Sequence, residues 1–207
     1  MMKPLNFSHI TKTGGSTIAN VSKRAGLKWA QYNKDRLQKQ RNNVHDIKGP
    51  VWHHPLSYFI PAFRDSFDWF CVMRDPIERC VSEFHCKWSG WKHFNPNGTP
   101  TAANLNAFIS RNVKNSMKFA HWHPQHRYIF DASGRRLVKH VLKFDNFVDE
   151  FNELAAEYKM DVRITPEDWS NRRKNNELTA KDLTKETRDL ILERYELDQL
   201  IYERLSP

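Results

Sequence analysis

Residues 69–84 read WFCVMRDPIERCVSEF, and they predict a buried strand that runs directly into a helix. The apolar run 69–73 shows no alternation with polar residues, which is typical of a strand covered on both faces in a parallel sheet. Asp75 stands at the N-cap position, Pro76 at the first helical position, and Glu78 at the third, where it completes a capping box. A buried strand followed at once by a capped helix indicates an α/β fold.

The rest of the chain continues this alternation of strands and helices. Further strands are predicted at 5–10, 51–54 and 137–144, and further helices at 16–25, 102–117, 147–158 and 185–205. The polar or Pro- and Gly-rich segments 31–48, 90–101 and 165–176 are interpreted as connections, although 31–48 also fits an exposed helix. Because no segment resembles a linker, we predict one three-layer domain over residues 1–207, with a central parallel sheet and helices on both faces.

The composition restricts the classes of function. The 207 residues include 33 Lys and Arg against 24 Asp and Glu, and the formal net charge of +9 predicts an anionic partner. No apolar run approaches the ~18 residues of a membrane-spanning helix, and the first residues lack the apolar stretch of a signal peptide. Cys71, Cys80 and Cys86 are too few for a disulfide framework. We therefore expect a soluble cytoplasmic protein without a membrane span.

A glycine-containing loop follows the first predicted strand. Residues 9–17 read HITKTGGST, and a loop of this kind before a helix presents backbone N–H groups to phosphate. Lys12 adds a positive charge, and the hydroxyls of Ser16 and Thr17 add donors. The alternative is a strand–helix turn in which the glycines serve geometry alone. Because the lysine precedes the glycines, the loop is P-loop-like without matching GxxxxGK[ST], which argues against an ATP-dependent kinase.

A second candidate phosphate site lies at the end of strand 69–73. Arg74 follows that strand directly, and Ser82 lies two turns into the next helix, on a side that can face back toward the strand end. A guanidinium and a hydroxyl can thus converge on one phosphate, with bidentate geometry from the arginine. The alternative is that Arg74 pairs with a nearby acidic residue.

Taken together, the motifs at 9–17 and 74–84 resemble those of the PAPS-dependent sulfotransferase superfamily, where PAPS is 3′-phosphoadenosine 5′-phosphosulfate. The form of the loop is most similar to the carbohydrate (Golgi-type) and related bacterial sulfotransferases, and residues 124–129 (PQHRYI) and 138–151 (VKHVLKFDNFVDEF) are similar to the same branch. The resemblance implies transfer of the sulfuryl group of PAPS to a hydroxyl of a sugar or small-molecule acceptor. It further implies release of PAP, adenosine 3′,5′-bisphosphate, and no requirement for a metal.

The resemblance also implies roles for individual residues. Lys12 would bind the bridging and 5′-phosphate oxygens and stabilise the leaving phosphate, and the rest of the loop would cradle that phosphate: Thr13, Gly14, Gly15, Ser16 and Thr17. Arg74 and Ser82 would hold the 3′-phosphate. Segment 170–176 would close over the nucleotide, with Arg172 or Arg173 near phosphate.

Sulfuryl transfer also needs a base for the acceptor's proton, and an imidazole suits that role near neutral pH. The sequence WHHP at 52–55 places two histidines at the end of a predicted short strand, and related carbohydrate enzymes use a His or a Glu from about this place in the chain. Adjacent strand residues point to opposite faces, so only one of the two can face the acceptor. We prefer His54 to His53, and a structural role for both is the alternative.

Other features leave alternatives open. His121, His123 and His126 invite a zinc site, but no cysteine or carboxylate stands at ligand spacing beside them, so acceptor contacts or packing are favoured. The aromatic-rich segment 88–94 suits either an acceptor cleft or the core. The second class of function is a non-catalytic basic module that binds acidic polysaccharide or nucleic acid. Segment 23–41 comes nearest to such a surface, but because it lacks a recognised nucleic-acid motif, nucleic acid is not favoured.

Overall fold

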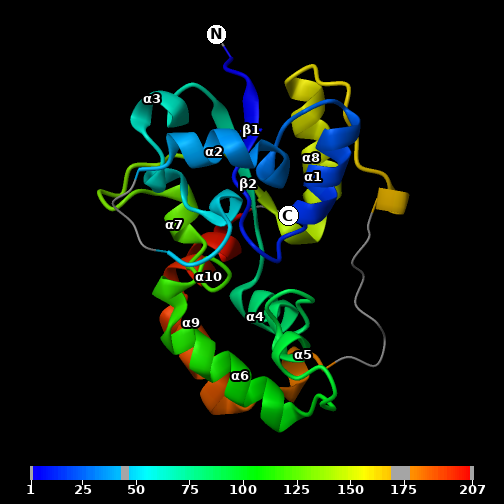
Figure 1. The fold of residues 1–207 in the computed structure, drawn as a ribbon, viewed down its shortest axis with the longest axis vertical. Helices are drawn as coiled ribbons and strands as arrows, with labels where there is room; N and C mark the ends of the chain where they lie inside the picture. Colours follow the sequence, from blue (N-terminus) through cyan, green and yellow to red (C-terminus); the bar gives the residue numbers. More distant parts are fainter. Residues whose placement is uncertain (1, 43–46, 169–177, 206–207) are drawn as a thin grey trace.

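A three-stranded parallel sheet forms the centre of the computed structural model, which describes residues 2–42, 47–168 and 178–205 (Figure 1). The strands are β1 (Leu5–Phe7), β2 (Asp68–Met73) and β3 (His140–Lys143), in the order β1-β2-β3. Leu5 pairs with Asp68 and Phe70 with His140, so β2 is the central strand. The predicted α/β class with a parallel sheet is confirmed.

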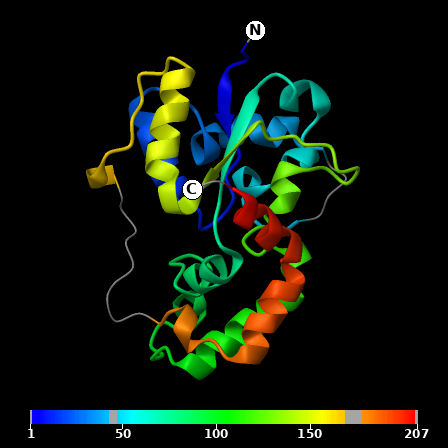
Figure 2. The same cartoon turned by 180° about the vertical axis from the view of Figure 1, so that it is seen from behind.

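One face of the sheet is covered by α1 (Gly15–Arg24) and α8 (Phe147–Glu157), which lie side by side in Figures 1 and 2. Phe70 and Val72 of β2 belong to the same buried cluster as Phe151 of α8, and all three are fully buried. Alternate side chains of the central strand, Phe70 and Val72, therefore pack between the sheet and these two helices.

The other face takes the alternate side chains Trp69, Cys71 and Met73, because successive residues of a strand point to opposite faces. The helices that contribute to this second cluster are α2 (Lys34–Gln40), α3 (Pro61–Arg64), α7 (His126–Ile129) and α10 (Glu196–Arg204). The apolar side chains of β2 thus pack against helices on both faces of the sheet, and the predicted three-layer arrangement is confirmed.

A helical lobe lies beyond the carboxyl end of β2 (Figure 1). It contains α4 (Pro76–Phe84), α5 (Trp91–Phe94), α6 (Ala102–Lys114) and α9 (Lys185–Arg194), which share a third buried cluster. The start of α4 is as predicted, since the Asp75 carboxylate accepts a hydrogen bond of 2.9 Å from the Glu78 N–H. The Glu78 carboxylate, however, lies 3.4 Å from the Arg74 guanidinium, an ion pair that the capping-box prediction did not include.

Several predicted elements need correction. The strand expected at 51–54 is wrong: Val51–His53 forms a 3₁₀ turn between two prolines, with the His53 N–H bonded to the Pro50 carbonyl at 2.9 Å. The helix expected at 185–205 divides at Tyr195, where the backbone leaves helical geometry with φ −114° and ψ 29°. The Tyr195 side chain is fully buried there and donates a hydrogen bond of 2.6 Å to the Trp122 carbonyl.

Some boundaries and one loop also differ. The outer strands are shorter than predicted, and segment 90–101 contains the short α5. Segment 31–48 contains the helix α2, which is the second of the two interpretations given for it. Among the described residues, no helix combines the length and the apolar character that crossing a membrane requires.

Candidate functional site

The two candidate phosphate motifs meet at the carboxyl edge of the sheet. The loop at 8–14 leaves β1 and enters α1, and Arg74 leaves β2 and leads into α4. Because β1 and β2 are parallel neighbours, both connections begin at the same edge. The Arg74 Nη1 atom donates a hydrogen bond of 3.3 Å to the Lys12 carbonyl. The structure therefore places the two motifs, which lie 62 residues apart in the sequence, in direct contact.

The loop before α1 has the backbone geometry of an anion site. Lys12 and Gly14 both adopt positive φ, 64° and 83°, which turns the chain sharply into the helix. Gly14 occupies the N-cap position, and no side chain among the described residues caps the N-terminus of α1. The first turn of α1 also lacks an acidic residue. The Thr17 N–H bonds to the Gly14 carbonyl at 3.0 Å, so the N–H groups that can receive a negative charge are those of Gly15 and Ser16. The Thr13 hydroxyl, by contrast, donates to the Ile10 carbonyl at 2.8 Å and stabilises the loop itself.

The His9 ring packs against the start of α1 at Gly15, a contact that the sequence did not reveal. A β-carbon on Gly15 would lie 1.9 Å from the His9 Nε2 atom, so only glycine permits this contact between the imidazole and the start of α1. Burial, together with the charges of the neighbouring His121 and Lys12, lowers the pKa of His9 to about 3. His9 is therefore neutral at physiological pH and acts as a packing surface for the loop.

Arg79 joins the loop to the segment that carries the later histidines. Its guanidinium is buried and donates hydrogen bonds to the Thr11 carbonyl and hydroxyl, both at 3.2 Å. The same group donates to the carbonyls of His121 and His123, both at 3.0 Å. Because one rigid fork holds two chain segments, Arg79 fixes the position of the loop relative to residues 121–123.

The surroundings of Arg74 suit recognition of a second anion. The Arg74 guanidinium lies 4.4 Å from the centre of the Phe144 ring, and its main chain is held by the Gln125 amide through bonds of 3.0 and 2.7 Å. Ser82 follows Glu78 by four residues and is half-buried, so it lies on the face of α4 that carries the partner of Arg74. The predicted pair Arg74 and Ser82 thus shares one side of the α4 start, with Glu78 between them.

His53 and His54 contact different parts of the structure. The His53 ring packs at 4.3 Å from the His9 ring, its Nδ1 lies 3.2 Å from the His9 carbonyl, and its Nε2 accepts from the Trp52 indole at 3.1 Å. The His54 Nε2 lies 3.1 Å from the Gly49 carbonyl instead. Carbonyls only accept, so the proton sits on Nδ1 of His53 and on Nε2 of His54. Burial lowers the pKa of both imidazoles, which keeps both neutral at pH 7.

His121 belongs to a charged cluster beside this region. Its Nδ1 lies 2.9 Å from the Glu83 carboxylate and 3.0 Å from the Ser89 hydroxyl, and the Cys86 thiol is also hydrogen-bonded to the ring. Burial opposes the charged imidazole, but the bonds to Cys86 and Glu83 outweigh it and raise the pKa of His121 to about 9. Burial likewise opposes the thiolate, yet the His121 bond lowers the pKa of Cys86 to about 7.

The three spaced histidines do not share one centre. The His126 Nδ1 lies 2.7 Å from the buried Asp198 carboxylate, and the His123 ring packs 6.2 Å from that of Tyr58. Only His121 joins the cluster with Glu83 and Cys86, which sequence spacing could not reveal because His121 lies 38 residues from Glu83.

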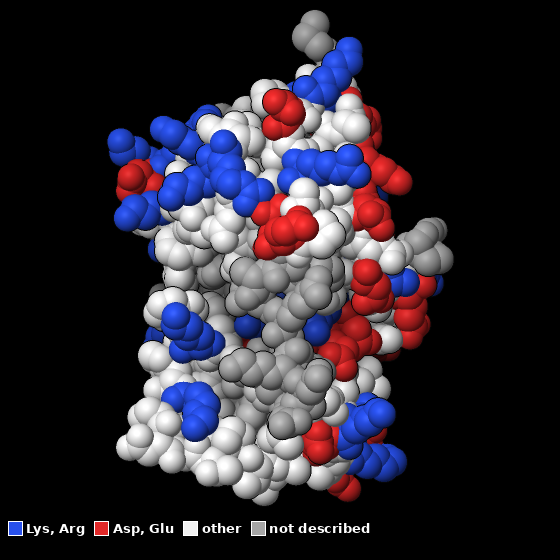
Figure 3. Space-filling view, turned by 90° about the vertical axis from the view of Figure 1, so that its right-hand side faces the viewer, with Lys and Arg blue, Asp and Glu red and all other residues white. Residues whose placement is uncertain are grey.

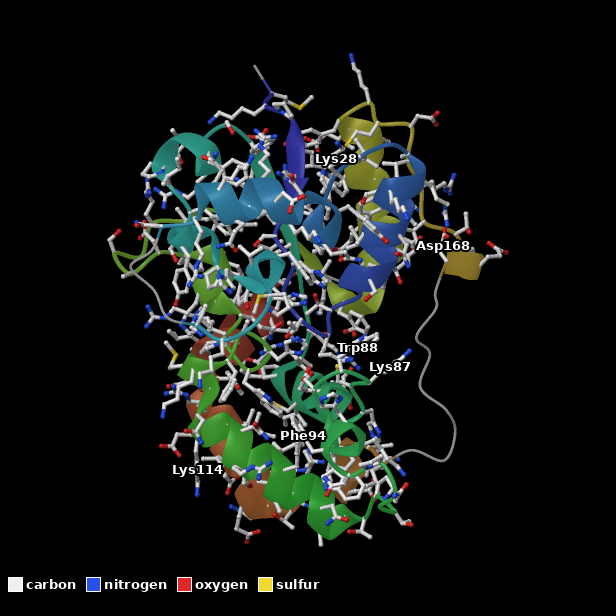
Figure 4. The ribbon with its side chains drawn as sticks, in the orientation of Figure 1. Lys28, Lys87, Trp88, Phe94, Lys114 and Asp168 are labelled. Carbon is white, nitrogen blue, oxygen red and sulfur yellow. The ribbon has the colours of Figure 1, made fainter. Side chains whose placement is uncertain are left out.

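The remaining predicted residues lie in segment 88–94 or outside the described residues, as Arg172 and Arg173 do. In segment 88–94, Trp88 and Phe94 are 71% and 64% exposed, so neither is a core residue (Figure 4). Trp91, by contrast, is partly buried and packs against the third cluster, where its ring stacks on that of Phe84. The Lys87 ammonium lies 4.7 Å from the centre of the Trp88 ring and adds positive charge to this surface. Figure 3 shows that basic side chains predominate at the upper left of the face it draws and acidic ones along its right-hand edge, with some of the opposite charge in both areas.

A family model described as "Sulfotransferase family" matches residues 3–203, nearly the whole chain. Searches of the curated proteins and of the solved structures found no match.

Proposed function

Because the chain belongs to the sulfotransferase family and is a sulfotransferase enzyme, we propose that it moves the sulfuryl group of PAPS to a hydroxyl of a sugar or small-molecule acceptor and releases PAP. The observation that carries the proposal is the bond of 3.3 Å between the Arg74 guanidinium and the Lys12 carbonyl. It joins two cationic motifs at one sheet edge, as a donor with phosphates at both ends requires. The family match also favours an enzyme over a non-catalytic basic module.

The residues of the loop fit the 5′ end of such a donor. The uncapped N-terminus of α1 offers the N–H groups of Gly15 and Ser16, and Lys12 adds its ammonium. Thr17 would contribute its hydroxyl, since its N–H bonds to the Gly14 carbonyl at 3.0 Å. Gly14 and Gly15 allow the loop its close packing, because a β-carbon would lie 3.0 Å from the Phe147 ring at Gly14 and 1.9 Å from the His9 ring at Gly15. Since the Thr13 hydroxyl is bonded within the loop, this residue would contribute its backbone N–H rather than its side chain.

Arg74 and Ser82 would hold the 3′-phosphate. The guanidinium offers paired N–H donors and the hydroxyl a third donor from the same side of α4. Glu78 pairs with Arg74 at 3.4 Å and is 38% exposed, so its carboxylate has room to turn toward solvent when a phosphate takes its place. PAPS would supply the sulfuryl group and a phosphate leaving group, and the protein would remove the acceptor's proton and stabilise the charge on the leaving phosphate.

The transfer step has a simple balance. The acceptor hydroxyl gives its proton to an imidazole, its oxygen forms a bond to sulfur, and the bond between sulfur and the bridging phosphate oxygen breaks with its electron pair. Lys12 and the positive end of α1 stabilise the charge that develops on that phosphate. No metal enters this balance.

We assign the base to His53, although the sequence alone favoured His54. The His53 ring packs at 4.3 Å from the His9 ring, which lies against Gly15 of the loop. The His54 Nε2 atom instead bonds to the Gly49 carbonyl, outside the loop. His53 Nε2 carries the lone pair, and the acceptor hydroxyl would displace the Trp52 indole from it. Hydrogen bonds of this kind commonly rearrange when substrate binds.

Calorimetric titration with PAP and with ATP tests the donor site. PAP should bind more tightly than ATP, and Lys12→Ala and Arg74→Ala should each weaken PAP binding by about 10–100-fold, as loss of a charged hydrogen bond costs roughly 1.5–3 kcal/mol. The exposed Lys114 on α6 provides a matched control, and Lys114→Ala should leave PAP binding unchanged. Equal affinity for PAP and ATP would contradict the proposed donor site.

The base is tested by the pair His53→Ala and His54→Ala. PAP release from PAPS is measured with a phenol, a monosaccharide and a desulfated polysaccharide as acceptors. His53→Ala should abolish transfer and leave PAP affinity nearly intact, while His54→Ala should retain transfer. The reverse result would assign the base to His54.

A further inference from the structure

Glu83, Cys86 and His121 form a compact group that the sulfuryl-transfer proposal does not use. One ligand atom of each, a carboxylate oxygen, the Sγ and a ring nitrogen, lies within 4.8 Å of the other two. Glu83 and Cys86 are buried, with 1% and 5% of their surfaces exposed, and the His121 side chain is 20% exposed. The group therefore forms a shielded site that opens to solvent on the His121 side.

The backbone holds these three residues in place. Glu83 lies in the last turn of α4, and the Cys86 N–H bonds to the Glu83 carbonyl at 2.9 Å, which keeps both side chains on one face. The His121 carbonyl accepts from Arg79 at 3.0 Å and from the Thr11 hydroxyl at 3.0 Å. Because each of the three residues is fixed by its own main chain, only side-chain torsions need adjust to bind a ligand.

The hydrogen bonding of Glu83 is incomplete. Its Oε1 atom is bonded both to the Ser89 hydroxyl and to the His121 Nδ1. Its Oε2 atom is buried and has no hydrogen-bond partner among the described residues. An unsatisfied oxygen on a buried carboxylate is costly, and a cation within the group would satisfy it.

We propose that Glu83, Cys86 and His121 bind one zinc ion. A thiolate, an imidazole and a carboxylate are ligands that zinc accepts, whereas magnesium and calcium prefer oxygen ligands. The charges of the thiolate and the carboxylate balance those of the ion, and binding releases the Cys86 proton together with any proton on the His121 nitrogen that meets the metal. Three protein ligands leave a fourth position open, the pattern of zinc sites that accept water or a substrate oxygen.

This site differs from the one that the spacing of His121, His123 and His126 suggested. It takes only His121 from that set, and its other two ligands come from the end of α4. The Arg79 and Thr11 bonds connect it to the loop that begins the phosphate site, so a metal here would stiffen one wall of the proposed donor site.

Cobalt titration of the chelator-treated protein tests the proposal, because a cysteine thiolate on Co²⁺ gives a charge-transfer absorption. We expect one equivalent to bind with that band and to be displaced by Zn²⁺. Loss of an outer-shell partner already weakens metal binding 10–100-fold, so Cys86→Ser, Glu83→Gln and His121→Gln should each weaken it by more than about 100-fold. Matched controls are Cys80→Ala, a buried thiol outside the group, and His93→Gln, an exposed imidazole, and both should bind as the unmodified protein does.

A measurement on the unsubstituted protein tests the site even if the variants fail to fold. Zn²⁺ should slow alkylation of Cys86 by iodoacetamide, read by mass spectrometry at that residue. Absence of the cobalt band, unchanged affinity in Cys86→Ser, or an equal loss in Cys80→Ala would each overturn the zinc site. These readouts need neither PAPS nor an acceptor, so a failure of the proposed sulfuryl transfer would appear separately in the PAP titration.

Discussion

Replacement of Arg79 by methionine should cost the protein about 4 kcal/mol of unfolding free energy. The buried guanidinium donates to three carbonyls, those of Thr11, His121 and His123. The His121 carbonyl keeps its bond of 3.0 Å from the Thr11 hydroxyl, but the described residues offer no second donor to the other two. Each buried carbonyl left unsatisfied costs roughly 1–3 kcal/mol, which gives a range of about 2–6 kcal/mol for the pair.

Urea unfolding of Arg79→Met, followed by circular dichroism, measures this loss. The exposed Arg111 on α6 provides the control, and Arg111→Met should change stability by no more than about 0.5 kcal/mol. PAP binding should weaken in Arg79→Met as well, because Thr11 leads directly into the loop. A loss below about 1 kcal/mol would refute the reasoning, since it would mean that both carbonyls find other donors or water.

Three further outcomes are expected. Gly15→Ala places a β-carbon 1.9 Å from the His9 Nε2, so it should lose roughly 1–3 kcal/mol in urea unfolding and bind PAP less tightly; full stability would contradict the close approach. Because burial lowers the pKa of His53 below its ordinary 6.5, this base stays unprotonated as the pH falls, and kcat/KM should remain level from about pH 8 to below pH 6.5. A decline centred on the ordinary value would refute that assignment. Asp198 is fully buried and accepts the Gln125 N–H at 2.7 Å, so Asp198→Asn should lower stability by about 1–3 kcal/mol; an unchanged melting temperature would show that its charge is not needed.

The elements predicted well are those whose signals are local. The continuous apolar run of β2 and the Asp75–Pro76 start of α4 identify a buried strand and a capped helix from adjacent residues. The strand predicted at 51–54 is wrong because hydrogen bonds to the Pro50 and Val51 carbonyls close a 3₁₀ turn there, and no periodicity distinguishes a strand from such a turn in so short a segment. The break at Tyr195 lies where this side chain is buried and bonded to the Trp122 carbonyl, 73 residues away, and the helical pattern of 185–205 does not signal it.

For the site, the sequence by itself identified the two candidate phosphate motifs, because a glycine loop and a strand-to-helix arginine are each built from neighbouring residues. Their contact, through Arg74 and the Lys12 carbonyl, follows from the parallel pairing of β1 and β2. Only the tertiary structure decided which imidazoles lie beside the loop, and it alone joined Glu83 and Cys86 to His121. The physical reason is that these groups come together through packing and buried hydrogen bonds between distant segments, and a linear pattern carries no information on such contacts.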